Sequence, residues 1–179
     1  MILETLLKRR SVRDFQDRPV EKEKINRLLQ ASLATPSGKD LRPREFILVD
    51  DRKLLEKLSH CKPSGSAFLA GAAFGVVVCA NPQQASAWVE DSAIASIILQ
   101  LAIEEEGLSS CWIQIRERRS PDGGMASDYI KSVLEIPQSF EVETIIAGGY
   151  AGNRPPASST AELELKKLHH NSFLRPFSL

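Results

Sequence analysis

Three arginines and one serine lie close together near the start of the chain, in the stretch KRRSVRDF from residue 8 to residue 15. The guanidinium group of arginine presents a fork of N–H donors that matches phosphate oxygens, and a serine hydroxyl adds a short-range donor. Arg9, Arg10, Ser11 and Arg13 therefore form a candidate phosphate-binding group. The plainer alternative is a solvated helix end with a modest dipole benefit. Taken alone, the residues favour that alternative.

The balance of charged residues limits the kinds of partner that the protein can attract. The 179 residues include 23 Lys plus Arg and 23 Asp plus Glu, so the formal charge is zero and no global field attracts nucleic acid or a membrane. Any bound anion must be held by a local cluster. The three cysteines form no CxxC pair, which favours a reducing, cytoplasmic setting over a disulfide framework. The length favours a single domain covering residues 1–179.

Common cofactor and metal motifs are missing. The sequence contains no GxxxxGK[ST] loop, no GxGxxG between a strand and a helix, and no GxSxG or HExxH. His60, His169 and His170 lack the spacing and the carboxylate partners of a metal site, so we expect no metal. Cys79 and Cys111 fall in apolar stretches that favour inert core thiols over nucleophiles.

The elements that must position these residues alternate between helices and strands. Periodicity and end signals predict helices over Ile2–Leu7, Glu21–Ala34, Lys53–His60, Trp88–Glu106 and Ala126–Leu134. Apolar, β-branched runs predict strands over Phe46–Val49, Phe74–Ala80, Leu108–Ile115 and Val142–Ala147. The tail from about residue 155 reads as extended. We therefore expect an α+β fold with one mixed or antiparallel sheet flanked by helices.

The predicted helix Trp88–Glu106 is apolar nearly all the way round between Ala93 and Ile103. A helix of that kind is buried on more than one side. It either runs through the core or lies in an interface between subunits.

Five segments follow one another along most of the chain. They are RRSVR with Phe15 after it, the loop PSGKDLRPREF from Pro36, the long helix from Trp88, the strand GLSSCWI from Gly107 and the turn GGY from Gly148. In this order they resemble the RxSx[RK], PSSxNxQPWxF, GLGxxW and near-terminal glycine motifs of the FMN-dependent nitroreductases. Each motif alone is weak, but five in the correct order and spacing are a strong signal.

The resemblance implies roles for particular residues. Arg9, Arg10 and Ser11 would hold the phosphate and ribityl oxygens of FMN, and Arg13 would lie by the N1/C2 edge of the flavin ring. A fixed cation there favours two-electron reduction, because reduced flavin carries negative charge around N1. The family is a homodimer with flavin in the subunit interface. The remaining implied cofactor-binding residues belong to the loop that reaches the partner's flavin, namely Pro36, Ser37, Gly38 and Asp40, with Trp112 either lining the pocket or packing the core.

Two departures from the family pattern stand out. Asp40 replaces an asparagine, while Arg42 and Arg44 replace glutamine and tryptophan and make the loop more basic. The family often adds a Lys or Arg to the phosphate near its C-terminus, and the matching stretch ASSTAELEL has neither. Arg154 is the nearby cation that could substitute.

The implied activity is hydride transfer from NAD(P)H through flavin N5 to a nitroaromatic, a quinone or a similar small electron-poor acceptor. Because the cofactor carries this chemistry, no dedicated catalytic residue is expected. Two alternatives stay open: another flavin reaction on the same fold, and a flavin-binding or sensor protein without rapid turnover. The expected protein is a cytoplasmic homodimer that binds neither nucleic acid nor membrane.

Overall fold

The computed structural model describes residues 1–177, and its centre is a four-stranded antiparallel sheet with strand order β2-β3-β5-β4. The strands are β2 (Arg44–Val49), β3 (Phe74–Ala80), β4 (Ser109–Gln114) and β5 (Glu141–Gly149). The expected α+β class is confirmed, and every strand pair in the sheet is antiparallel. β2 and β4 are its two edges.

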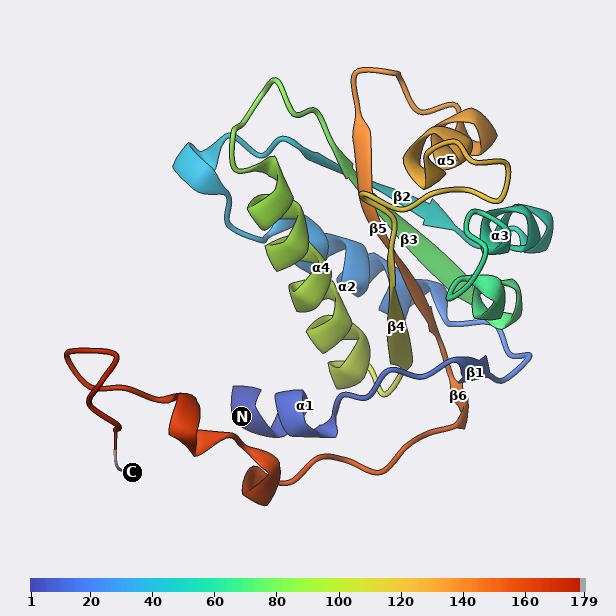
Figure 1. The fold of residues 1–179 in the computed structure, drawn as a ribbon. Coiled ribbons are helices and arrows are strands. Elements are labelled where there is room, and N and C mark those ends of the chain that lie inside the picture. The colour runs from blue at the N-terminus through green and yellow to red at the C-terminus, as the bar shows by residue number, and fades with distance from the viewer. Residues whose placement is uncertain (178–179) are drawn as a thin grey trace.

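Helices cover both faces of this sheet (Figure 1). On one face lie α2 (Lys22–Leu33) and α4 (Trp88–Glu105), and on the other lie α3 (Arg52–Ser59) and α5 (Ala126–Leu134). The short α1 (Ile2–Lys8) contacts α4. The five expected helices are therefore present, with boundaries within about two residues of the prediction.

Alternation along the strands builds two apolar clusters. Val76 and Ile146 face α4, whereas their neighbours Val77 and Ile145 face α3 and α5. Successive side chains of a strand point to opposite faces, so an uninterrupted apolar run such as Phe74–Ala80 is stable only when both faces are covered. All seven residues of β3 are buried.

Local signals set the ends of the elements. The Asp51 carboxylate accepts a hydrogen bond of 2.9 Å from the Leu54 backbone N–H and caps α3. Gly107 follows α4 with φ of +72°, a conformation that glycine adopts without strain. Gly148 pairs with Phe74 across the sheet, and a Cβ atom at position 148 would lie 2.3 Å from the Phe74 ring. The GGY turn therefore depends on packing as well as on backbone conformation.

Several short elements were not predicted. β1 (Asp14–Phe15) and β6 (Ala151–Asn153) form a separate two-stranded sheet, and η1 (Gly38–Asp40) and η2 (Ala67–Gly71) are short 3₁₀ segments. Segments of two to five residues are too short to carry a periodic signal.

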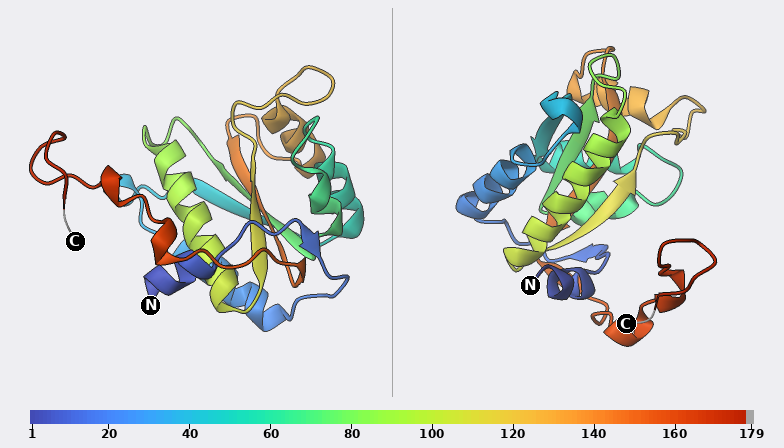
Figure 2. Two further views of the ribbon diagram at one scale, coloured as in Figure 1. Left: turned by 60° about the horizontal axis from the view of Figure 1, so that its bottom comes forward. Right: turned by 90° about the vertical axis from the view of Figure 1, so that its left-hand side faces the viewer.

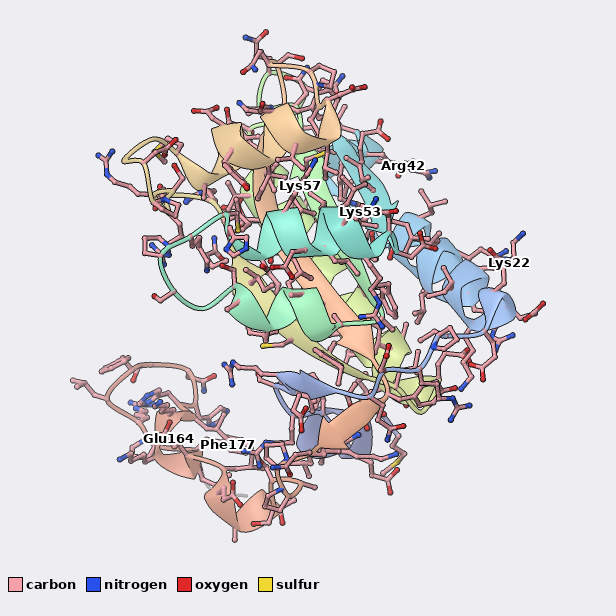
Figure 3. The ribbon with its side chains drawn as sticks, turned by 90° about the vertical axis from the view of Figure 1, so that its right-hand side faces the viewer. Lys22, Arg42, Lys53, Lys57, Glu164 and Phe177 are labelled. Atoms are coloured by element: carbon pink, nitrogen blue, oxygen red, sulfur yellow. The ribbon has the colours of Figure 1, made fainter. Side chains whose placement is uncertain are left out.

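The C-terminal arm, residues 155–177, leaves β6 and extends away from the sheet and its helices (Figure 2). The arm contains two short 3₁₀ turns, η3 (Thr160–Glu162) and η4 (Leu165–Lys167). Glu164 and Phe177 are labelled on the arm in Figure 3, well apart from Lys53 and Lys57 on α3. Within residues 1–177, no helix is both long and apolar enough to cross a bilayer.

Candidate functional site

The arginine-rich segment runs along the edge of the sheet directly after α1. The Val12 backbone N–H donates to the Ser110 carbonyl oxygen at 3.0 Å, and Ser11 and Ser110 form an isolated parallel bridge. The Val12 side chain is fully buried. β4 is an edge strand with unpaired backbone groups, so the segment takes up part of that free edge. This pairing fixes Ser11 between its flanking arginines.

The charges of this segment are largely unneutralised. Among residues 1–177, no carboxylate oxygen lies within 4.0 Å of the side-chain nitrogens of Arg9, Arg10 or Arg13. Arg10 donates to the Pro156 carbonyl oxygen. The Arg13 guanidinium carbon lies 5.8 Å from the centroid of the Phe68 ring, a cation–π distance. Arg9 and Arg13 are therefore cations that a bound anion could neutralise.

A buried ion pair holds the start of the segment. The Glu104 carboxylate on α4 is 4% exposed and lies 2.6 Å from an Arg154 nitrogen and 3.7 Å from Lys8 Nζ. Arg154 also donates to the Lys8 carbonyl oxygen at 2.7 Å and to the Ser109 hydroxyl at 3.2 Å. Arg154 thus links the residue before Arg9 to α4 and to β4.

The loop Pro36–Asp40 is held by different residues. The buried Arg44 guanidinium donates to the Thr35 carbonyl oxygen at 2.6 Å and to the Pro36 carbonyl oxygen at 2.9 Å. Burial lowers the pKa of Arg44, and nearby Asp91 opposes this effect. The Gly38 backbone N–H donates to an Asp91 carboxylate oxygen at 2.9 Å.

The same loop carries its own charge compensation. The Arg42 guanidinium donates to both Asp40 carboxylate oxygens, at 2.7 Å and 3.0 Å, and lowers the pKa of Asp40. Lys39, Asp40 and Arg42 have φ of 52°, 55° and 47°, a region that costs free energy for residues other than glycine. The two added arginines therefore act differently: Arg42 offsets the charge of Asp40, as expected, whereas Arg44 is buried on backbone oxygens and anchors the loop.

The Pro36–Asp40 loop and the arginine-rich segment lie at opposite ends of α4. Gly38 binds Asp91 in the first turn of the helix, whereas Arg154 binds Glu104 in its last turn. More than three turns separate the two carboxylates, a rise of about 20 Å. Within one chain, the structure does not bring Pro36, Ser37, Gly38 and Asp40 to Arg9, Arg10, Ser11 and Arg13.

Comparison with known proteins identifies the fold family. The model of the nitroreductase family matches residues 6–62, which include the arginine-rich segment and the Pro36–Asp40 loop. A protein of Methanothermobacter thermautotrophicus, provisionally named NADH dehydrogenase/NAD(P)H nitroreductase, is 32% identical over 157 residues, covering 86% of this chain and 79% of its own. The chain belongs to the nitroreductase family.

Solved structures of nitroreductases agree with this assignment. The FMN-dependent nitroreductase from Clostridium difficile R20291 superposes with a TM-score of 0.94 at 42% identity, over 96% of this chain and 99% of that one. A protein of Parabacteroides distasonis, provisionally named NADH dehydrogenase/NAD(P)H nitroreductase, gives a TM-score of 0.84 at 36% identity over 95% and 97%. The sequence-based resemblance to nitroreductases is confirmed.

Trp112 of this nitroreductase chain lies in β4, two residues after Ser110. Its side chain packs partly buried on the α4 side of the sheet and donates to the Gln114 side-chain oxygen at 2.9 Å. Its neighbour Cys111 points to the opposite face, where Ser11 hydrogen-bonds its thiol and Arg13 lies nearby. The structure thus supports the packing alternative for Trp112, and its role in cofactor binding stays a prediction.

Sequence reasoning missed two residues on the Cys111 side. Lys62 Nζ donates to the Gln114 carbonyl oxygen at 2.9 Å, and Phe68 supplies the ring beneath Arg13. Lys62 lies in the turn CKPSGS and Phe68 in a 3₁₀ segment, neither of which matches a motif.

All three cysteines are free and buried. Burial raises the pKa of the Cys79 thiol to about 12 and raises the pKa of Cys61 and Cys111. At Cys111 this effect is partly opposed by Arg13, Ser11 and Lys62. The predicted inert role fits these environments.

Proposed function

We propose that the protein is an FMN-dependent oxidoreductase that takes electrons from NADH or NADPH and passes them to an electron-poor small molecule, such as a nitroaromatic or a quinone. The observation that carries the proposal is the arginine-rich segment, bonded to the edge strand at Ser110 with the charges of Arg9 and Arg13 unpaired among residues 1–177. Family membership and an FMN-dependent neighbour at 42% identity support it.

The residues present fit FMN. Guanidinium groups and a hydroxyl are the donors that bind a phosphate monoester, and Arg9, Arg10 and Ser11 supply them from one short segment. Arg9, Arg10 and Ser11 would hold the phosphate and the ribityl oxygens. Arg13, over the Phe68 ring, would lie at the N1/C2 edge of the flavin. When bound, FMN supplies the two-electron redox chemistry.

The chain's own contribution is binding and electrostatics. Arg13 would stabilise negative charge that develops on the reduced ring, because a preorganised cation needs no reorganisation during the reaction. Phe68 and the backbone of β4 would fix its position. No acid, base or nucleophile is required of the protein, and we assign no catalytic residue.

A second copy of the chain would complete the site. The Pro36–Asp40 loop and the Arg9–Arg13 segment lie at opposite ends of α4. Both can therefore contact the same flavin only if two copies of the chain each supply one of them. α4 carries an apolar stripe for such an interface: Ile94 is 40% exposed, and Ile97, Ile98 and Leu101 are half-buried. Residues at this spacing lie on one face of a helix. We therefore propose a homodimer with α4 in its interface.

The experiment is anaerobic reduction of the purified protein loaded with FMN. Rapid loss of the 450-nm absorbance region on adding NADH or NADPH is expected, followed by its return when a nitroaromatic or quinone is added. Arg9→Ala should weaken FMN binding by about ten- to a hundredfold, since a charge-assisted hydrogen bond contributes roughly 1.5–3 kcal/mol. Lys53→Gln, which removes an exposed charge on α3, is the matched control (Figure 3). Unchanged FMN affinity in Arg9→Ala would contradict the proposal.

A flavin carrier without turnover is the second candidate. The missing C-terminal cation favours it, because fewer donors would hold the phosphate. The Asp40 carboxylate is a weaker reason, since Arg42 already neutralises it. A carrier would bind FMN and be reduced by dithionite, yet neither nicotinamide would reduce it rapidly.

A further inference from the structure

A basic pocket lies between the turn after α3 and the loop after β4. It has a volume of about 360 Å³ and is lined by Lys62, Pro63, Ser64, Arg118 and Arg119. Lys62 to Ser64 belong to the turn after α3, and the two arginines to the loop after β4. The pocket is formed by two segments far apart in the sequence, so its charges meet only in the folded chain.

The loop that carries the arginines has a fixed backbone. The Ala126 N–H donates to the Arg118 carbonyl oxygen at 2.9 Å, and the Ser120 N–H donates to the Gly124 carbonyl oxygen at 3.0 Å. An antiparallel bridge joins Arg119 to Met125. These bonds close the loop on itself and hold positions 118 and 119 at the pocket wall.

The three cations have no counter-charge among residues 1–177. No carboxylate oxygen there lies within 4.0 Å of the side-chain nitrogens of Lys62, Arg118 or Arg119. The neighbouring Arg116, in contrast, pairs with Glu117 at 2.9 Å and with Glu143 at 3.6 Å. The carboxylates of Glu117 and Glu143 thus pair with Arg116, which lies outside the pocket, and not with the pocket cations.

Lys62 is the most constrained of the three. Its side chain is half-buried, and Nζ donates to the Gln114 carbonyl oxygen at 2.9 Å. Burial and the nearby Arg118 both lower the pKa of Lys62, so its charge is held at a free-energy cost. An ammonium has three donors, and two remain for a ligand. A bound anion would offset both the desolvation and the repulsion from Arg118.

The pocket and the proposed flavin site contact the same strand, four residues apart. Gln114, which Lys62 contacts, belongs to β4, and Ser110 of the same strand binds the arginine-rich segment. Lys62 and Arg13 both lie near enough to Cys111 to oppose the rise of its pKa that burial causes. The proposed flavin site and the pocket are therefore linked through β4 and lie on the side of the sheet that Cys111 faces.

We propose that this pocket binds the phosphate or carboxylate group of a substrate that exchanges electrons at the proposed flavin site, so that the enzyme prefers a substrate that carries this group over an analogue that lacks it. The proposal rests on the proposed function for the substrate's role, and on the unpaired charges of Lys62, Arg118 and Arg119 for the ligand. Two sources share this chemistry: the 2′-phosphate of NADPH, and a carboxylate on the electron acceptor.

The test compares, in the holoprotein, pairs of substrates that differ by one anionic group. Wild type, Lys62→Gln/Arg118→Gln, Arg118→Gln alone and the control Lys53→Gln are reduced with NADPH or NADH, then reoxidised with 4-nitrobenzoate or 4-nitrobenzamide. The pocket variants should raise KM for the member of one pair that carries the extra anionic group, by about tenfold or more, because each variant removes a charge-assisted contact. The kcat, and the KM of the member that lacks this group, should change little.

The substrate pair whose KM changes selectively identifies the source of the anion. A selective effect on NADPH assigns the 2′-phosphate, and a selective effect on 4-nitrobenzoate assigns the carboxylate. Equal changes in KM for the two members of each pair would overturn the proposal. Arg118→Gln leaves the Lys62–Gln114 bond intact, so it keeps the test valid if the double variant unfolds.

Calorimetry gives a readout that does not need turnover. Adenosine 2′,5′-bisphosphate and 4-nitrobenzoate are titrated into oxidised wild type and into Lys62→Gln/Arg118→Gln at two salt concentrations. At least one probe should bind wild type in a salt-sensitive way and bind the variant about tenfold or more weakly. Binding of neither probe to wild type would overturn the proposal. A protein that holds no FMN but binds a probe would instead contradict the proposed function and leave the pocket assignment standing.

Discussion

Replacing Arg154 by alanine tests whether this arginine belongs to the scaffold or to the phosphate site. Its guanidinium lies 2.6 Å from the buried Glu104 carboxylate and 2.7 Å from the Lys8 carbonyl oxygen. In Arg154→Ala, the Glu104 carboxylate keeps Lys8 Nζ, at 3.7 Å, as its remaining ion-pair partner among residues 1–177. We expect the main effect on the free energy of unfolding, with a smaller effect on FMN affinity.

The expected magnitude follows from the burial of the pair. Removing one partner of a fully buried ion pair costs about 3–5 kcal/mol. The Arg154 side chain is 29% exposed, so water can replace part of what is lost. We therefore expect a loss of about 2–3 kcal/mol. For a chain of this size, each kcal/mol lowers Tm by about 2–4 °C, which gives a decrease of about 4–12 °C.

Thermal unfolding at one protein concentration and saturating FMN measures this effect. The double variant Glu104→Leu/Arg154→Met should unfold at a higher temperature than Arg154→Ala, because it leaves no buried charge without its partner. FMN affinity is measured in parallel with Arg9→Ala. Wild-type Tm in Arg154→Ala, combined with a loss of FMN affinity as large as that of Arg9→Ala, would refute the reasoning and make Arg154 a phosphate ligand.

Three further predictions concern other parts of the site and its support. Arg44→Met should speed hydrogen exchange of residues 35–40, because each buried carbonyl oxygen left without a donor costs roughly 1–3 kcal/mol. Arg42→Gln, which removes an exposed ion pair of about 0–1 kcal/mol, should change that exchange little, and equal effects would contradict the anchoring role of Arg44. Arg13→Ala should make the flavin reduction potential more negative, by about 20 mV for each 1 kcal/mol of lost interaction with the reduced ring; an unchanged potential in a protein that still binds FMN would argue against its place at the ring. Burial raises the pKa of Glu143, against the lowering effects of Gln114 and Arg116. Its neutral form therefore stabilises the fold at low pH, and this contribution is lost as pH rises through the raised pKa. Glu143→Gln should raise the free energy of unfolding at pH 7 and have little effect below about pH 4, as measured by urea denaturation; a loss of stability at pH 7 would reverse the assigned sign.

Strong periodic signals account for most of the fold that was predicted. The run FGVVVCA and the long apolar stretch after Trp88 gave β3 and α4 within one residue, because burial on both sides leaves an unambiguous pattern. β1 and β6 were missed because two or three residues carry no period. Their pairing depends on where Asp14 and Asn153 meet after the chain has folded.

The candidate site was predictable only where a motif exists. RRSVR and the Pro36–Asp40 loop are recognisable from residue types in order, and hydrogen bonds anchor both to neighbouring elements. From the sequence, Arg44 counts only as added positive charge in the loop, because no local pattern distinguishes a buried guanidinium from an exposed one. Lys62 and Arg118 lie more than fifty positions apart and meet through the turn after α3 and the loop after β4, a contact that no sequence spacing encodes.

The burial of the cysteines has a consequence for an enzyme with the proposed activity. Quinones and partly reduced nitroaromatics are electrophiles, and their usual targets on a protein are thiolates. Burial raises the pKa of the Cys79 thiol to about 12, so the thiol form predominates at neutral pH. Cys61 and Cys111 are likewise shielded from solvent, even though Cys111 adjoins the proposed flavin site. An enzyme built this way would resist alkylation by its own substrates and products.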